Sequence, residues 1–143
     1  MSQALMVVPT GLGAGLTTAV LGLFHAMNRQ GIKVHFFKPI AQSANSDSSK
    51  DSSIEMLQVD CAYPIAQPIP MRHAEHLVTQ NRGDELLEEI VARYEQSCPT
   101  DNEVIIIEGM VPTDNQPYAT RINKEIAKAL DAQVVLVAAP GTD

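Results

Sequence analysis

The sequence predicts an α/β fold of three layers, in which helices cover both faces of a mostly parallel β-sheet. Short apolar runs typical of buried strands alternate with longer amphipathic segments typical of helices. Strands that are separated by helices pair in parallel through right-handed crossovers. A glycine-rich turn joins the first apolar run to the first amphipathic segment, and such a junction is a common place for an anion to bind.

The predicted elements alternate along the chain. Strands are expected at 5–8, 33–38, 104–108 and 134–139, and helices at 16–29, 52–59, 72–79, 84–97 and 118–130. The segment 42–53 is rich in Ser, Asn and Asp and is expected to be a loop. Ser52 and Glu55 have the spacing of a capping box, which predicts that a helix begins there.

The last predicted strand, 134–139, is apolar at every position, so we expect it to be a central strand buried on both faces. A strand of this kind in a parallel sheet is followed by a helix and then by further strands. The sequence ends at Asp143, soon after this strand, and we therefore expect a C-terminally truncated fold. An unpaired apolar edge favours self-association.

Composition and charge narrow the classes of function. The chain has 143 residues, which is one domain or slightly less, and a net charge of −7. The segment from Asp84 to Glu103 has seven acidic residues against Arg93 alone and so carries −6 of that charge, the opposite of a nucleic-acid surface. No apolar run approaches the ~18 residues of a membrane span. Two distant cysteines and the lack of a basic leader predict a cytoplasmic protein with neither nucleic acid nor membrane as partner.

The glycine turn resembles a phosphate-binding loop with two substitutions, Thr10 in place of its first glycine and Leu16 in place of its lysine. Gly11, Gly13 and Gly15 lie between the first strand and the first helix, where free N–H groups and the helix dipole attract anions. A Walker A loop places lysine before its final Ser or Thr, whereas here Leu16 precedes Thr17. The turn is interpreted as a degenerate phosphate loop, with a dinucleotide site or a purely structural turn as alternatives.

Two charged residues follow predicted strands at the edge that carries this loop. Lys38 ends the second strand and Glu108 the third, and the carboxyl ends of parallel strands lie at one edge of a sheet. The two side chains are candidates for ligand contact or for a structural ion pair with each other. Thr17 either satisfies the first turn of its helix or contacts phosphate or Mg²⁺.

A set of motifs, in this order, resembles the N-terminal domain of long-form bacterial phosphate acetyltransferases. The motifs are Pro-Thr-Gly at 9–11 with Gly-Leu-Thr at 15–17, Phe-Lys-Pro-Ile-Ala-Gln at 37–42, the apolar run 104–108 with Gly-Met-Val-Pro-Thr at 109–113, Asn-Lys-Glu-Ile-Ala-Lys at 123–128, and Gly-Thr-Asp at 141–143. That domain is similar to dethiobiotin synthetase. The resemblance therefore implies a P-loop NTPase-like, dethiobiotin synthetase-like fold.

The resemblance also implies a function for the parent protein. Phosphate acetyltransferases exchange an acetyl group between coenzyme A and phosphate, and this chemistry belongs to a C-terminal domain that is absent from this chain. The N-terminal domain is associated with homo-oligomer stability and with effectors such as NADH, pyruvate and phosphoenolpyruvate. Residues 1–143 are thus expected to be a single, incomplete N-terminal domain without catalytic residues.

The dethiobiotin synthetase pattern maps onto individual positions of this chain. Its loop lysine corresponds to Leu16, and its Lys-Pro after the second strand corresponds to Lys38. Its Mg²⁺ ligands correspond to Thr17, Asp51 and Glu108, which makes nucleotide and Mg²⁺ candidate ligands. A regulatory and assembly domain is the leading hypothesis. An ATP-dependent ligase of the dethiobiotin type and a purely structural assembly module are the alternatives, and Leu16 argues against the ligase.

Overall fold

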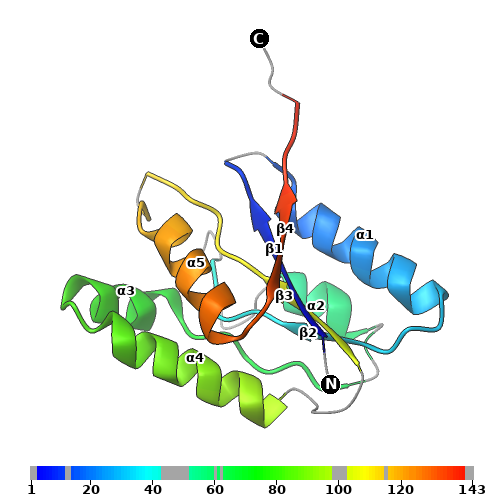
Figure 1. Cartoon of the computed structure of the whole chain (residues 1–143), viewed down its shortest axis with the longest axis horizontal. Coiled ribbons are helices and arrows are strands. Elements are labelled where there is room, and N and C mark those ends of the chain that lie inside the picture. Colours follow the sequence, from blue (N-terminus) through cyan, green and yellow to red (C-terminus); the bar gives the residue numbers. More distant parts are fainter. Residues whose placement is uncertain are drawn as a thin grey trace.

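Four parallel strands form the centre of the molecule in the computed structural model, which describes residues 3–11, 14–42, 52–59, 61, 63–97, 103–114 and 116–140. The sheet has the order β2-β3-β1-β4 (Figure 1). Its strands are β1 (Gln3–Pro9), β2 (Val34–Phe37), β3 (Val104–Glu108) and β4 (Gln133–Val137). All three pairings in the sheet are parallel, as the alternation of strands and helices predicts.

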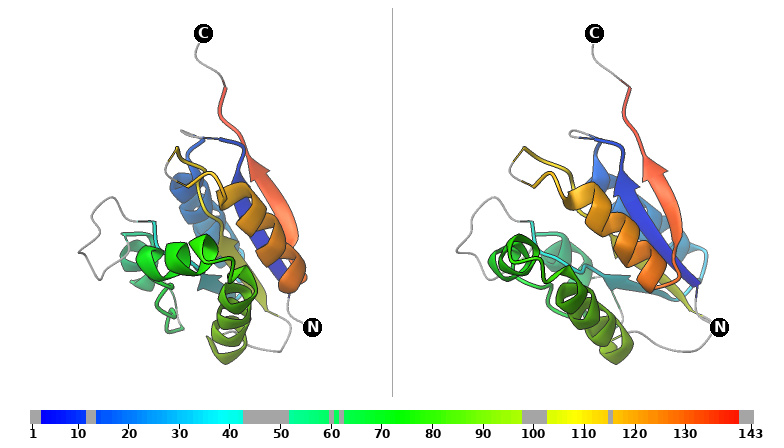
Figure 2. Two further views of the ribbon diagram at one scale, coloured as in Figure 1. Left: turned by 90° about the vertical axis from the view of Figure 1, so that its left-hand side faces the viewer. Right: turned by 60° about the vertical axis from the view of Figure 1, so that its left-hand side comes forward.

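Helices cover both faces of this sheet, which confirms the three-layer α/β/α prediction. Helices α1 (Leu16–Arg29) and α2 (Ser52–Gln58) lie on one face, and α3 (Met71–Thr79), α4 (Gly83–Ser97) and α5 (Ala119–Ala129) lie on the other (Figures 1 and 2). All five predicted helices are present, and no end differs by more than one residue. None of the described helices is long and apolar enough to cross a membrane.

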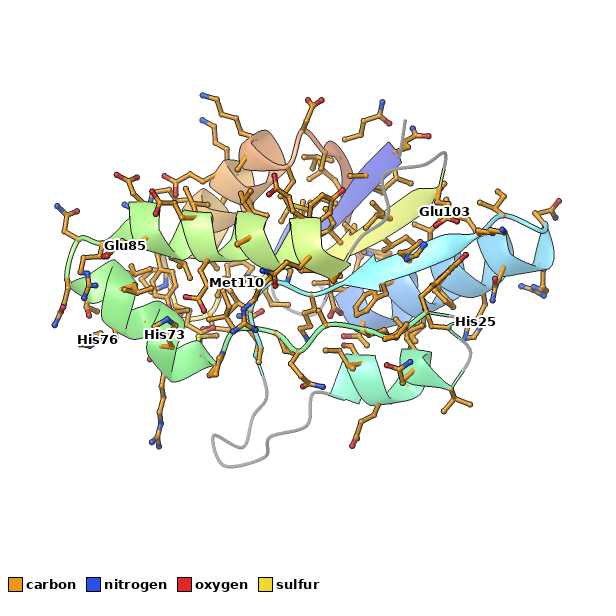
Figure 3. The ribbon with its side chains drawn as sticks, turned by 90° about the horizontal axis from the view of Figure 1, so that it is seen from below. His25, His73, His76, Glu85, Glu103 and Met110 are labelled. Atoms are coloured by element: carbon orange, nitrogen blue, oxygen red, sulfur yellow. The ribbon has the colours of Figure 1, made fainter. Side chains whose placement is uncertain are left out.

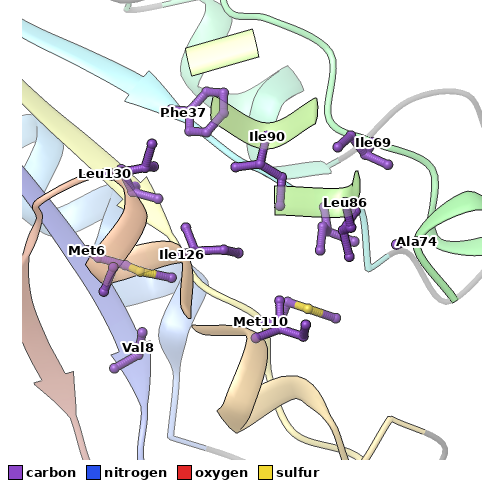
Figure 4. Packing of buried hydrophobic residues seen from close by; sticks show 14 of the residues in the cluster. Met6, Val8, Phe37, Ile69, Ala74, Leu86, Ile90, Met110, Ile126 and Leu130 are labelled. Carbon is purple, nitrogen blue, oxygen red and sulfur yellow. The ribbon is translucent and has the colours of Figure 1, made fainter. Parts of the chain in front are cut away.

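Successive residues of the central strands belong in alternation to two separate hydrophobic clusters, one on each face of the sheet. Met6 and Val8 of β1 pack under α3, α4 and α5, whereas Val7 packs toward α1 and α2. In β3, Ile105 and Ile107 join the first cluster and Ile106 joins the second, with each of the three side chains fully buried. Figure 4 shows the first cluster, in which α4 and α5 close over the strands. This period of two explains why the inner strands are apolar at nearly every position.

The fourth strand agrees with one part of the prediction and differs from another. It pairs with β1 alone among the described strands, which leaves the unpaired apolar edge that the sequence predicts, but it is not buried on both faces. Val134 and Leu136 are 51% and 68% exposed. An apolar run shows what a strand is able to bury, but burial needs a covering element, and α5 packs over the neighbouring strands instead. Whether further strands pair with β4 stays a prediction.

The close packing of Gly109, directly after β3, against β1 predicts how a larger side chain at this position would affect stability. A Cβ atom on Gly109 would lie 2.8 Å from Val8 Cγ1 and 3.1 Å from the Val7 carbonyl oxygen. We expect Gly109→Ala to lower the free energy of unfolding by about 1–3 kcal/mol, as overpacking does. A matched Gly22→Ala in α1, where a Cβ meets nothing within 4 Å, should raise it by up to about 1 kcal/mol. Urea denaturation of both variants measures this, and equal changes would contradict the steric argument.

Candidate functional site

The turn between β1 and α1 brings backbone donors to the carboxyl edge of the sheet. Gly15 caps α1 in the left-handed region, with φ 76°, a conformation that glycine adopts without strain. The amide of Thr10, at the other end of the turn, donates to the Val137 carbonyl of β4 over 2.9 Å. A Cβ on Gly11 or Gly15 would meet nothing within 4 Å, so there is open space beside these two glycines. Gly13 lies outside the described residues.

Leu16 enters this turn only through its backbone. Its side chain is 5% exposed and packs with Val20 and Phe24 in the hydrophobic cluster under α1. The predicted loop residue is therefore a core residue, because an apolar side chain at this position gains more from burial than from contact with an anion. The free N–H groups of the first helical turn remain as anion donors.

Four polar side chains from four elements meet beside the turn, and we call Thr17, Lys38, Ser53 and Glu108 the carboxyl-edge cluster. Thr17 Oγ1 and Ser53 Oγ each donate to Glu108 Oε1 over 3.2 Å. Lys38 Nζ lies 3.0 Å from Glu108 Oε2 and 3.5 Å from Ser53 Oγ. The carboxylate is thus surrounded by one ammonium group and two hydroxyl groups.

The ion pair in this cluster is almost entirely buried. Lys38 is 8% exposed and Glu108 is 2% exposed. The contact through Oε2 is an ion pair rather than a well-directed hydrogen bond. Of the two interpretations that the sequence left open for these residues, the structure contains the ion pair, and contact with a ligand stays a prediction.

In the described residues the cluster holds an ammonium group beside the carboxylate that the resemblance implied as a Mg²⁺ ligand. Thr17 and Glu108 do converge, but Lys38 is paired with the carboxylate that the metal would need. Mg²⁺ requires about six oxygen ligands at close to 2.1 Å, and an ammonium group among those oxygens supplies none and repels the ion. Asp51, the third predicted ligand, lies outside the described residues. Within the described part of the chain, no group of three or more His, Cys, Asp or Glu side chains is arranged to hold a metal.

Two amide side chains fix the backbone that follows β3. Asn123 accepts from the Met110 amide and donates to the Met110 carbonyl, both over 2.8 Å. Gln42 makes the same pair of bonds with Val111, over 2.6 and 2.9 Å. These residues hold the segment after Glu108 in one position, which in turn fixes the carboxylate.

Sequence reasoning missed Ser53 and these two amides as site residues. Asn123 carried a signal, because it lies one helical turn from Ala119 and Ala127 on the buried side of α5. Ser53 carried none, since the capping-box pattern already accounted for the serine pair. Gln42 lay in a segment that was interpreted as loop.

An open groove of about 650 Å³ runs between α5 and β4, next to the glycine turn. Val134 and Leu136 form its apolar side, and Lys124 and Lys128 lie on its α5 side. The views in Figure 2 place α5 beside β4, with the turn at the same end of both elements.

A second polar group lies at the opposite, amino-terminal edge of the sheet. His35 and Glu103 form a hydrogen bond, the Tyr63 hydroxyl donates to Glu103 over 3.2 Å, and the His35 and Tyr63 rings stack 3.8 Å apart. Figure 3 shows Glu103 beside the start of β3. Burial and the neighbouring Glu103 carboxylate raise the pKa of Tyr63. This group ties the segment around Tyr63 to the sheet, far from the glycine turn.

The buried ion pair predicts an asymmetric response to mutation. Lys38→Met should lower the free energy of unfolding by about 3–5 kcal/mol, because it leaves the Glu108 carboxylate buried without its cation. The double variant Lys38→Met/Glu108→Gln should recover a large part of that loss. Urea denaturation of the wild type, the two single variants and the double variant measures the coupling. Additive losses would contradict a direct pair.

Comparison with known proteins gives matches along nearly the whole chain, both to a family model and to individual relatives. The family model described as "AAA domain" matches residues 3–143. Phosphate acetyltransferase of Haemophilus influenzae is 40% identical over 143 residues, that of Salmonella typhimurium 41% over 143, and that of Pseudomonas aeruginosa 44% over 134. These alignments cover 94–100% of this chain and 19–20% of the relatives, so the chain spans about one fifth of their length.

A solved structure supports the fold alone. The signal recognition particle receptor FtsY from Elizabethkingia anophelis superposes with a TM-score of 0.54 at 20% sequence identity. The match covers 94% of this chain and 41% of that protein.

Proposed function

This chain belongs to the AAA domain family, and on that premise we propose that it is a ligand-binding regulatory and assembly domain of a phosphate acetyltransferase, without catalytic activity of its own. The observation that carries the proposal is the combination of an end-to-end match to phosphate acetyltransferases with the replacement of the loop lysine by Leu16. The relatives are about five times as long as this chain. The proposal assigns acetyl transfer between coenzyme A and phosphate to the other four fifths.

We extend the proposal to the location and the oligomeric state of the whole protein. The whole protein would be a cytoplasmic homo-oligomer of acetate metabolism, and this domain would stabilise the oligomer. Its ligand would be a small anionic metabolite or nucleotide, held by the N–H groups at the start of α1 and the open turn around Gly15. NADH, pyruvate, phosphoenolpyruvate and ATP are the candidates.

Ligand binding by this turn is testable with a thermal-shift screen. We expect at least one of ATP, NADH, pyruvate, phosphoenolpyruvate and phosphate to raise the melting temperature, since a ligand at 100 times its Kd stabilises the folded state by about 2.7 kcal/mol. Gly15→Asp should remove the shift, because it places a negative charge at the helix N-terminus. Gly31→Asp is the matched control, since Gly31 has nearly the same conformation, φ 78° against 76°, beyond the other end of α1.

Three results of the screen are informative. Loss of the shift in Gly15→Asp with its retention in Gly31→Asp supports the proposal. Retention of the shift in Gly15→Asp would mean that the ligand binds elsewhere, and equal loss in both variants would contradict a site confined to the turn. No shift with any of the five compounds would favour a purely structural assembly module.

The domain should not turn over ATP. A charge-assisted contact such as that of a loop lysine is worth about 1.5–3 kcal/mol, and the buried Leu16 side chain cannot provide it. We expect no sustained release of ADP by the pure domain in the presence of Mg²⁺. Continuous ADP release that Thr17→Ala abolishes would instead support a ligase of the dethiobiotin type.

A further inference from the structure

We infer that Lys38 is the resident cation of the carboxyl-edge cluster and that its ammonium group keeps divalent metal ions from binding Glu108. The inference concerns the cluster itself and stands whether or not the proposed ligand binding is correct. It reverses the expectation from the resemblance, in which the same residues hold Mg²⁺.

The hydrogen-bond directions in the cluster favour this assignment. Ser53 accepts from Lys38 and donates to Glu108 Oε1, and Thr17 donates to the same oxygen. The other carboxylate oxygen faces the ammonium nitrogen at 3.0 Å. The single hydrogen of each hydroxyl group is thus directed at the carboxylate, so the Glu108 charge is already compensated by one cation and two hydroxyl donors.

Burial strengthens the electrostatic effect of the Lys38 ammonium group on any cation at Glu108. The side chains of Lys38 and Glu108 are 9% and 2% exposed, so water screens little of their interaction. The lysine charge already offsets the carboxylate charge. A divalent ion bound to the same carboxylate would meet the full repulsion of the ammonium group at close range.

The backbone holds Lys38 in place from the next residues onward. The Pro39 carbonyl accepts from the Ile69 amide over 2.8 Å, and the Ala41 amide donates to the Ile69 carbonyl over 2.9 Å. These two bonds fix the start of the lysine side chain against the neighbouring segment. The backbone next to Lys38 is thereby held, which limits the positions that the ammonium group can reach.

Mn²⁺ binding by the wild-type chain and by variants of Lys38 and Glu108 tests the inference. Mn²⁺ is titrated into wild type, Glu108→Gln, Lys38→Met and Lys38→Met/Glu108→Gln, and free Mn²⁺ is followed by electron paramagnetic resonance. Mn²⁺ bound at the cluster is the difference between the Mn²⁺ bound by a variant with Glu108 and by the same variant with Glu108→Gln. This difference excludes adventitious binding by surface carboxylates, and we expect it to be zero in the wild type. We expect one Mn²⁺ in Lys38→Met, bound at least about tenfold more tightly, because one like charge is gone.

A second readout is stability. Mn²⁺ and Mg²⁺ should raise the melting temperature of Lys38→Met, while the wild type and the double variant should not respond. A wild-type Mn²⁺ site that is lost in Glu108→Gln would overturn the inference, as would a folded Lys38→Met that gains no Mn²⁺. If Lys38→Met does not fold in Mn²⁺, the comparison of wild type with Glu108→Gln decides alone.

Discussion

The carboxylate of Glu108 has to be neutralised where β3 ends, and the arrangement of the carboxyl edge depends on this requirement. An isolated charge in a protein interior costs several kcal/mol unless a partner and hydrogen bonds compensate for it. Here the compensation comes from Lys38 after β2, Thr17 in the first turn of α1 and Ser53 in α2. One carboxylate therefore fixes the relative positions of two strands and two helices that lie far apart in the sequence.

The surroundings of this carboxylate are held just as firmly. Gly109 lets β3 end against Val8 with no room for a side chain. The amides of Asn123 and Gln42 then satisfy both backbone groups of the next two residues, Met110 and Val111. Buried backbone groups that were left without such partners would each cost about 1–3 kcal/mol. The segment that follows β3 is thus held by side chains from α5 and from the segment after β2.

The sequence predicts the layers and the helices well because they follow from local periodicity. The alternation of apolar runs gives the parallel sheet, and the strand order along the chain brings Lys38 and Glu108 to one edge. What periodicity cannot supply is the cover over a strand, and β4 is accordingly an apolar strand that the described residues leave exposed. Ser53 is missed for a related reason. Its contact with Glu108 depends on which side of α2 faces the sheet, and the capping-box pattern gives no information about that orientation.

The hydrogen bond between the Thr10 amide and the Val137 carbonyl gives the molecule a mechanical property. The first residue of the glycine turn is tied to the last residue of β4, and the strand is in register with β1 up to Pro9 and Val137. A shift of β4 along its own axis therefore pulls on the turn. Whatever holds that strand in register also holds the Thr10 amide, where the turn begins. Because coupling free energy is reciprocal, an anion bound as proposed at this turn would also hold the edge strand more firmly in its register.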